Sequence, residues 1–267
     1  MRPKSAGLLI AVIAAAVPLV VLGNALIVLL FPWFAHFQYA LPGFPDDPFG
    51  LSGAARADLG ATGIRSIWPV GAGPDLLREA RLPDGALAFN AREIRHMIDV
   101  RELVQFSLLL WLAALAAASG AALALSRSGR PEAIRRALGI GATVTIALLA
   151  VAGLAMAIDF ETIFDQFHRL FFADGTWTFG NDETLRRLYP DAFWGIAGGL
   201  LAGVAVAQAV ALRVWVSRRA SGGPGPQSAS GEPAAGESSA DEPAAGESSA
   251  GESSAATSPA GAPPTDQ

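Results

Sequence analysis

The sequence predicts an all-α integral membrane protein: a four-helix transmembrane bundle with two helical or irregular extracytoplasmic loops and a disordered C-terminal tail. Of its 267 residues, 52% are hydrophobic and 16% are charged, whereas an average soluble domain has about 25% charged residues. Four apolar stretches are long enough to cross a bilayer, which takes about 20 residues in a helix. We expect these spans at about residues 8–31, 103–125, 138–158 and 193–216.

The first apolar stretch also resembles a cleaved signal peptide, because Arg2 and Lys4 precede it. Its apolar run is too long for a signal peptide, however, and no small-x-small cleavage site follows before residues 31–33. We therefore expect this segment to stay in the protein as a membrane anchor.

The distribution of arginine predicts the orientation of the spans, because cytoplasmic loops carry an excess of Lys and Arg. The N-terminus, the loop between the second and third spans and the segment after the fourth span are basic. Loops 32–102 and 159–192 contain more acidic than basic residues. We expect both termini in the cytoplasm and both long loops outside.

The last part of the chain has a composition of its own. Two near-identical decamers, GEPAAGESSA and DEPAAGESSA, follow one another, and GESSA then appears again. With almost no large apolar side chains, such a segment cannot offset the entropy lost on ordering. We therefore divide the chain into a four-span membrane domain, 1–219, and a disordered, acidic, low-complexity tail, 220–267.

Several functions are disfavoured by what the sequence lacks. It contains no cysteine, so disulfides, thiol nucleophiles and zinc–cysteine sites are excluded. No G-x-S-x-G, HExxH or P-loop motif is present, which argues against serine-hydrolase and zincin chemistry. Nothing supplies a basic field for nucleic acid, so we expect no nucleic-acid partner.

Proton transfer near neutral pH is best served by histidine, and the chain has three, all on the predicted outer side. His96 precedes the second span in a charged segment, where Glu93, His96 and Asp99 share one face of a helix. The alternative is a charged helix start with solvent-exposed ion pairs, such as Arg95 with Asp99. We expect His36, with no carboxylate near it in the sequence, to be an interfacial residue.

His168 lies in a segment that we expect to be an amphipathic helix. Its phenylalanines form an apolar stripe, and Asp165 precedes His168 by three residues, where its carboxylate could orient the imidazole as a general base. The alternative is an interfacial helix anchored by the phenylalanines, with His168 only at the level of the headgroups.

Residues 91–100 and the segment from 167 to 194 resemble two signatures of a family of small four-span bacterial membrane proteins. The second signature comprises residues 167–172, then Trp177, Phe179 and Asp182, and then residues 188–194. Some members of this family are lipoprotein intramolecular transacylases. The resemblance covers about residues 5–216.

The resemblance implies a reaction that moves the sn-2 acyl chain of a diacylglyceryl lipoprotein to the α-amino group of its N-terminal cysteine. It implies a bacterial cell-membrane location, an active site at the outer leaflet, a lipoprotein substrate in contact with membrane lipid, and no cofactor. By this resemblance His168 and His96 would carry the catalysis. The helical spacing adds the carboxylates Asp165, Asp99 and Glu93 as candidates beside these histidines. Substrate would be bound by Arg92, Arg169, Trp177, Asp182 and Phe172.

Two other functions remain open at this stage. Glu93-x-x-His96 and Asp165-x-x-His168 both have the i, i+3 spacing of helical di-metal sites, which would suit a metal-dependent membrane enzyme. A non-enzymatic scaffold would instead use the outer loops and the tail as docking surfaces.

Overall fold

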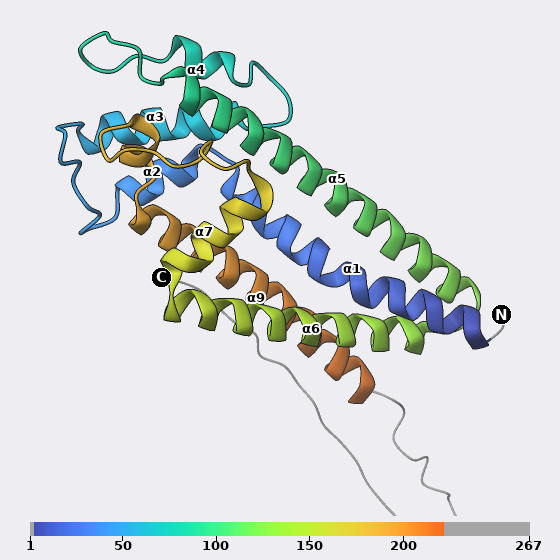
Figure 1. Ribbon diagram of the computed structural model, residues 1–267. Coiled ribbons are helices and arrows are strands. Elements are labelled where there is room, and N and C mark those ends of the chain that lie inside the picture. Colours follow the sequence, from blue (N-terminus) through green and yellow to red (C-terminus); the bar gives the residue numbers. More distant parts are fainter. Residues whose placement is uncertain (1–2, 222–267) are drawn as a thin grey trace, which may run out of the picture. The chain divides into compact units, whose positions relative to one another are not determined.

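The computed structural model of the protein describes residues 3–221, and the predicted tail beyond them lies outside the described part (Figure 1). Apart from one isolated β-bridge between Arg81 and Leu87, the regular structure of these residues is helical. The helices are α1 (Pro3–Leu29), α2 (Trp33–Tyr39), α3 (Gly53–Ser66), α4 (Asp75–Glu79), α5 (Ala91–Arg127), α6 (Pro131–Ile158), α7 (Phe160–Phe171), α8 (Thr184–Leu188) and α9 (Asp191–Ser221).

Four of these helices, α1, α5, α6 and α9, are long and apolar enough to cross a membrane. They contain the four predicted spans except for residues 30–31, which follow the end of α1, so the predicted fold class is confirmed. At 1.5 Å per residue, α5 is roughly 55 Å long and exceeds the hydrocarbon core of about 30 Å. Its polar first three turns, residues 91–102, therefore extend beyond the apolar stretch.

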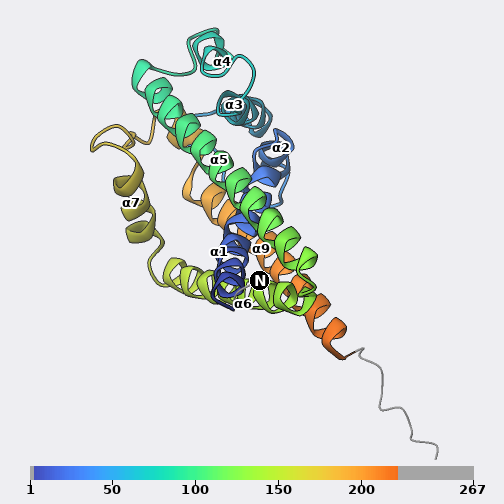
Figure 2. The same ribbon diagram turned by 90° about the vertical axis from the view of Figure 1, so that its right-hand side faces the viewer.

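The bundle is organised around α1, which packs against α5, α6 and α9 (Figure 2). Small residues allow this close approach. A Cβ atom on Gly141 of α6 would lie 2.6 Å from Cβ of Val17 and 2.8 Å from the carbonyl oxygen of Ala14, and one on Gly23 of α1 would overlap the Trp111 side chain. Glycine at these positions lets the helix backbones approach as small residues do in membrane bundles.

Polar side chains also join the spans. Asn24 of α1 donates from Nδ2 to Oε1 of Gln208 in α9 at 2.8 Å, and Trp111 of α5 donates to Oδ1 of Asn24 at 3.0 Å. Gln208 in turn donates to the backbone carbonyl of Val204 at 3.2 Å. Because lipid offers no hydrogen-bond partner, such groups must be satisfied within the protein. This polar clamp therefore holds α1, α5 and α9 together.

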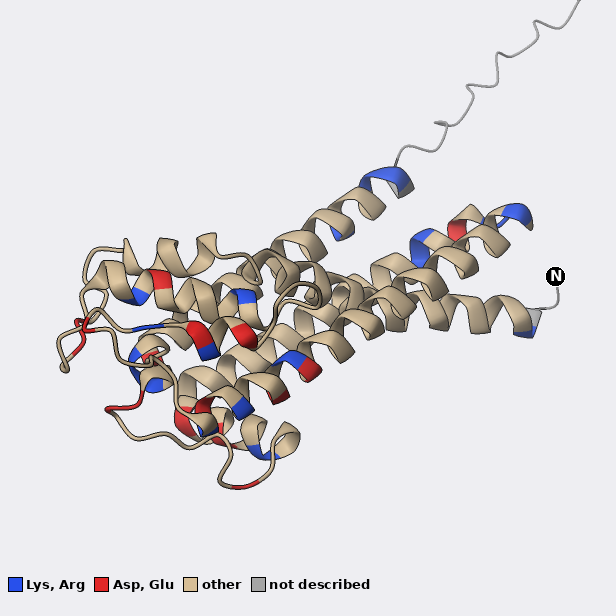
Figure 3. Ribbon diagram, turned by 90° about the horizontal axis from the view of Figure 1, so that it is seen from above, with Lys and Arg blue, Asp and Glu red and all other residues tan. Residues whose placement is uncertain are grey.

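The shorter helices gather at one end of the bundle, and most of the acidic residues of the described part lie there too (Figure 3). This end has its own apolar core, which includes Leu77, Phe89, Met97 and Leu188. Buried polar contacts hold the segments around that core together. The main one is the 2.8 Å ion pair between Asp47, in the loop before α3, and Arg187 of α8. The loop end is thus a packed platform on which side chains can be held in fixed positions.

Candidate functional site

His96 of α5 and His168 of α7 meet at the loop end, although they are far apart in the sequence. Their ring centroids lie 6.2 Å apart, with an interplanar angle of 25°. The two residues are only 8% and 7% exposed. The third histidine, His36 of α2, lies elsewhere, half exposed, with its Nε2 atom 4.0 Å from Oδ1 of Asp58. The structure therefore brings together the two histidines that were predicted to be catalytic.

His96 is placed by the start of α5, which is a capping box. The side chain of Asn90 accepts hydrogen bonds from the backbone N–H groups of Arg92 and Glu93, and the Glu93 carboxylate accepts one from the backbone of Asn90 at 2.8 Å. These bonds satisfy amide groups that a helix start leaves free. The register of α5, and with it the direction of His96 one turn later, is fixed in this way.

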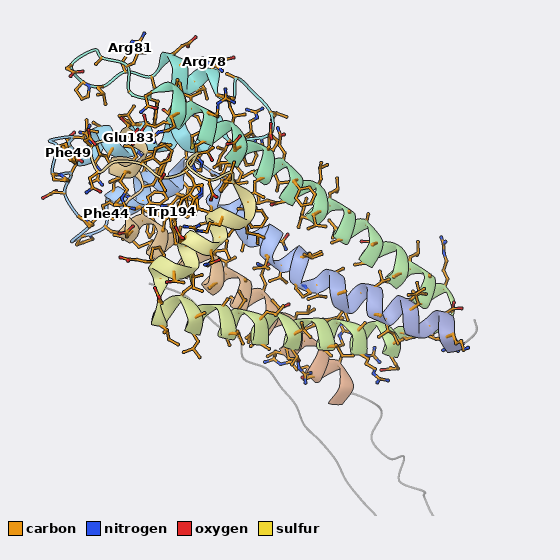
Figure 4. All side chains as sticks on the ribbon, viewed as in Figure 1. Phe44, Phe49, Arg78, Arg81, Glu183 and Trp194 are labelled. Atoms are coloured by element: carbon orange, nitrogen blue, oxygen red, sulfur yellow. The ribbon has the colours of Figure 1, made fainter. Side chains whose placement is uncertain are left out.

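The same carboxylate ties the helix start to the second half of the site. Oε1 of Glu93 accepts a hydrogen bond from the backbone N–H of Leu185 at 2.7 Å. Glu183, labelled in Figure 4, accepts from Asn90 at 2.9 Å and from Arg92 at 2.5 Å. Glu93 was predicted to be catalytic, but its two oxygens are engaged by backbone amides, so its role in the structure is to hold the two signature segments together.

The orientation of His168 corrects the sequence prediction. Its Nδ1 atom lies 2.7 Å from the carbonyl oxygen of Phe164, one turn earlier in α7. The Asp165 carboxylate instead accepts a 2.7 Å hydrogen bond from Nε of Arg169 and makes none with His168. The permanently charged guanidinium at i+4 competes for the carboxylate, and the helix carbonyl is better placed for the imidazole. Asp165 therefore does not orient His168.

The Phe164 carbonyl also determines which nitrogen of His168 carries a proton. A carbonyl oxygen can only accept, so a neutral His168 must donate from Nδ1. Its Nε2 atom then has a free lone pair. Carbonyl and carboxylate groups fix histidine tautomers in this way in many sites. The geometry supplies what a general base needs, a neutral imidazole with one committed and one available nitrogen.

Aromatic rings enclose the two imidazoles. The centroid of Phe164 lies 4.1 Å and that of Trp177 lies 4.9 Å from the centroid of His168. Phe172 lies 5.0 Å from His96 and 5.5 Å from His168, and Phe179 lies 5.4 Å from His96. Phe172 and Trp177 were predicted from the second signature, and the structure places both beside the histidines.

This burial keeps both imidazoles neutral. It lowers the pKa of His96 to about 4, with the neighbouring His168 as a second cause. Burial is also the main reason that the pKa of His168 is lowered, against the opposing effects of the Phe164 carbonyl and the Asp165 charge. A charged imidazole loses its hydration in such surroundings, so the neutral form predominates. Both side chains are therefore in the neutral form at neutral pH.

Two buried nitrogen atoms in this cluster have no hydrogen-bond partner among the described residues: Nδ1 of His96 and Nε1 of Trp177. Buried polar atoms are usually satisfied, and each exception calls for an explanation. The indole N–H of Trp177 can only donate. Its position beside His168 suits a bound carbonyl or oxyanion.

The remaining predicted residues are less closely involved. Arg92 is paired with Glu183 and stacks over Phe179, and Arg169 is paired with Asp165.

Asp182 is exposed, and Asp99 is half-buried. Neither of these carboxylates makes a hydrogen bond in the described part of the chain, and the alternative Arg95–Asp99 ion pair is not formed there.

The carboxylate–histidine pairs on which the metal alternative depended do not converge. Glu93 binds backbone amides and Asp165 binds Arg169. Within residues 3–221, no three His, Asp or Glu side chains form a group that could hold a metal ion. These residues therefore do not fit a helical di-metal site.

The fold and the histidine pair define a class of membrane-integral helical proteins with a histidine site at one end of the bundle. A family model of the lipoprotein intramolecular transacylase Lit matches residues 75–194, a range that includes both histidines. The resemblance seen in the sequence is thereby confirmed, and the match supports the prediction that the chain is an enzyme of the transacylase class.

Solved structures of membrane-integral Lit from Bacillus cereus have the same fold. One has a TM-score of 0.67 at 17% identity and covers 82% of this chain and 99% of its own. A histidine-to-alanine variant of that protein has a TM-score of 0.60 at 16% identity, covering 81% and 94%. An uncharacterized protein from Aquifex aeolicus (strain VF5) is 27% identical over 168 residues, which are 60% of this chain and 71% of that protein.

Proposed function

We propose that the protein moves the sn-2 acyl chain of a diacylglyceryl lipoprotein to the α-amino group of its N-terminal cysteine, giving a lyso-form lipoprotein. The match to the transacylase family over residues 75–194 supports this reaction. The observation that carries it is His168, a buried neutral imidazole whose Nδ1 is committed to the Phe164 carbonyl while Nε2 is free.

In this reaction His168 acts as the general base. The substrate ammonium, whose pKa is about 8, first loses one proton to water; Nε2 then takes a second proton from the amine nitrogen as this nitrogen attacks the ester carbonyl. When the tetrahedral intermediate collapses, the C–O bond to glycerol breaks and the departing oxygen takes the proton back from Nε2. The ester becomes an amide and the glycerol hydroxyl is released, so no oxidant or added water is consumed.

The oxyanion of the intermediate needs a hydrogen-bond donor. Arg92 and Arg169 were considered for this role, but each is paired with a carboxylate. We assign it to the indole N–H of Trp177, which is buried and unpartnered beside His168, with His96 as the neighbouring polar group. Phe172 lines the site for the apolar part of the substrate. Asp99 and Asp182 remain predictions for positioning and binding.

Nucleophile and ester belong to one substrate molecule, which removes much of the entropy cost of bringing them together. We further propose that both termini are cytoplasmic and that the site faces the outer leaflet. The basic end of the bundle, opposite the acidic loop end in Figure 3, supports this orientation.

Replacing His168 tests the proposal directly. Purified full-length protein is incubated with a synthetic diacylglyceryl lipopeptide, and mass spectrometry follows the N-acyl, S-lysoglyceryl product. His168→Gln should lower the rate by about 10²–10⁴, the usual contribution of a general base. His36→Gln, which changes a histidine outside the cluster, should leave the rate within twofold. Near-normal transfer by His168→Gln would refute the mechanism and favour a scaffold.

A further inference from the structure

A groove lies between α6 and α9 at the basic end of the bundle, opposite the histidine site. Its volume is about 400 Å³. The two helices pack against each other along this region (Figures 1 and 2). The groove is lined by both charged and apolar side chains, among them Arg135, Arg136, Gly139, Ile140, Val144 and Arg213. None of these residues is involved in the proposed transacylation.

The charge in this groove is largely uncompensated. Arg135 pairs with Glu132, but its Nε atom is buried and has no hydrogen-bond partner. The guanidinium groups of Arg136 and Arg213 make no hydrogen bond or ion pair within residues 3–221. Three arginines against one glutamate leave an excess of positive charge. Arginine presents a planar set of donors that matches the oxygens of a phosphate.

The position of Arg213 is unusual for a charged residue. It is the one charged residue within the fourth predicted span, 193–216. It lies next to Gly139 of α6, where a Cβ atom would be 3.7 Å from Nη1 of Arg213. Charged side chains within spans are rare and are usually paired or functional. An anion from outside the described chain would supply the missing partner.

The apolar lining indicates which kind of anion fits. Ile140 and Val144 lie on α6 beside the arginines and are 41% and 42% exposed. In a membrane these apolar side chains would contact acyl chains, while the long arginine side chains would extend toward the headgroups. A free phosphate ion would use only the charged part of this surface. Basic pockets between membrane helices commonly bind anionic lipid headgroups.

We propose that this groove binds an anionic phospholipid, with Arg136 and Arg213 holding the phosphate and the apolar side chains of α6 in contact with an acyl chain. The Nε atom of Arg135 supplies an additional donor. This lipid is a bound component and not the acyl donor, since the groove and the histidine site lie at opposite ends of the bundle. The proposal does not depend on the transacylase reaction.

Native mass spectrometry of the full-length protein in neutral detergent tests the site, with phosphatidylglycerol as the probe and phosphatidylcholine, whose headgroup is zwitterionic and has no net charge, as the comparison. Phosphatidylglycerol should bind at least tenfold more tightly than phosphatidylcholine. The double variant Arg136→Gln/Arg213→Gln should lose at least tenfold in affinity for phosphatidylglycerol. Arg127→Gln removes a charge from the same end of the bundle but outside the groove, and should bind as the wild type does.

A second variant, Arg213→Lys, tests the site even if the double variant does not fold. It keeps the charge but loses the planar donor set of arginine. It should retain the preference for phosphatidylglycerol over phosphatidylcholine with a severalfold lower affinity. Equal binding of the two lipids by the wild type, or unchanged phosphatidylglycerol binding by the double variant, would overturn the proposal. So would displacement of phosphatidylglycerol by millimolar inorganic phosphate, which would identify a site for free anions.

Discussion

At the scale of single residues, the unpartnered indole N–H of Trp177 offers a sharp test of catalysis. Trp177→Phe keeps an aromatic ring beside His168 but removes the donor. If this N–H stabilises the oxyanion, kcat should fall by about 10²-fold while KM changes little, because the bond strengthens only in the transition state. The measurement is steady-state transfer on the lipopeptide.

Trp68→Phe is the matched control for this change, because Trp68 packs against Phe31, away from the histidines. Its kcat should stay near the wild-type value. Asp165→Asn should also stay within a fewfold of normal, since Asp165 binds Arg169 and not His168. A normal kcat for Trp177→Phe would remove this residue from the mechanism.

The lowered pKa of His168 predicts the pH dependence of the reaction. Only the neutral imidazole accepts a proton, and a lowered pKa means that this form persists to more acidic pH than for a free histidine, whose pKa is about 6.5. The rate should therefore show an inflection below pH 6.5, in addition to one near pH 8 from the substrate amine. A profile of kcat/KM between pH 4.5 and 9 measures both. A lower inflection above pH 6.5 would contradict the buried, neutral base.

The structure brings together several residues that were predicted for the site, whereas the predicted pairing of Asp165 with His168 is not formed. His96, His168, Trp177 and Phe172 do lie together, as the resemblance implied. Glu93, which was predicted to be catalytic, is part of a capping box in the structure, and the Asn90-x-x-Glu93 pattern of that box is already present in the sequence. Spacing along a helix shows which side chains share a face, but it cannot show which of several competing partners each one binds.

At the scale of elements, close packing of α6 against α1 depends on Gly141. Gly141→Ala would place a methyl group 2.8 Å from a backbone oxygen that cannot move freely. Gly153→Ala, in the same helix, would meet nothing within 4 Å and should gain about 1 kcal/mol of helix propensity.

Overpacking costs about 1–3 kcal/mol, so Gly141→Ala should melt roughly 3–10 °C below Gly153→Ala in detergent. Thermal unfolding followed by circular dichroism measures the difference. Equal melting temperatures would show that α1 and α6 can separate slightly at no cost.

The elements themselves were largely predictable. Apolar stretches of sufficient length identify membrane helices, and the phenylalanine stripe indicated α7. The separate helices α2, α3 and α4 of the loop end were not predicted from the sequence. Their order depends on long-range contacts such as Asp47 with Arg187, which no local pattern reveals.

At the scale of the whole molecule, orientation in the membrane decides whether the histidine site can reach its substrate. The chain has no cysteine, so single cysteines report directly on each side. Ala72→Cys lies in the exposed loop before α4, and Ser128→Cys lies between α5 and α6. In intact cells an impermeant maleimide should label the first, and should label the second only after permeabilisation. The reverse pattern would place the histidines in the cytoplasm and contradict the proposed reaction.

The polar clamp has a consequence for how the protein is made. Asn24 enters the membrane early in synthesis, whereas its partner Gln208 arrives only with the last helix. Until then Asn24 can bind Trp111 but keeps an unpaired amide in lipid, which costs about 1–3 kcal/mol. A chain whose translation stops before the fourth helix cannot repair this defect. The contact that closes the finished bundle thus also distinguishes complete chains from truncated ones, in which the amide of Asn24 stays unpaired.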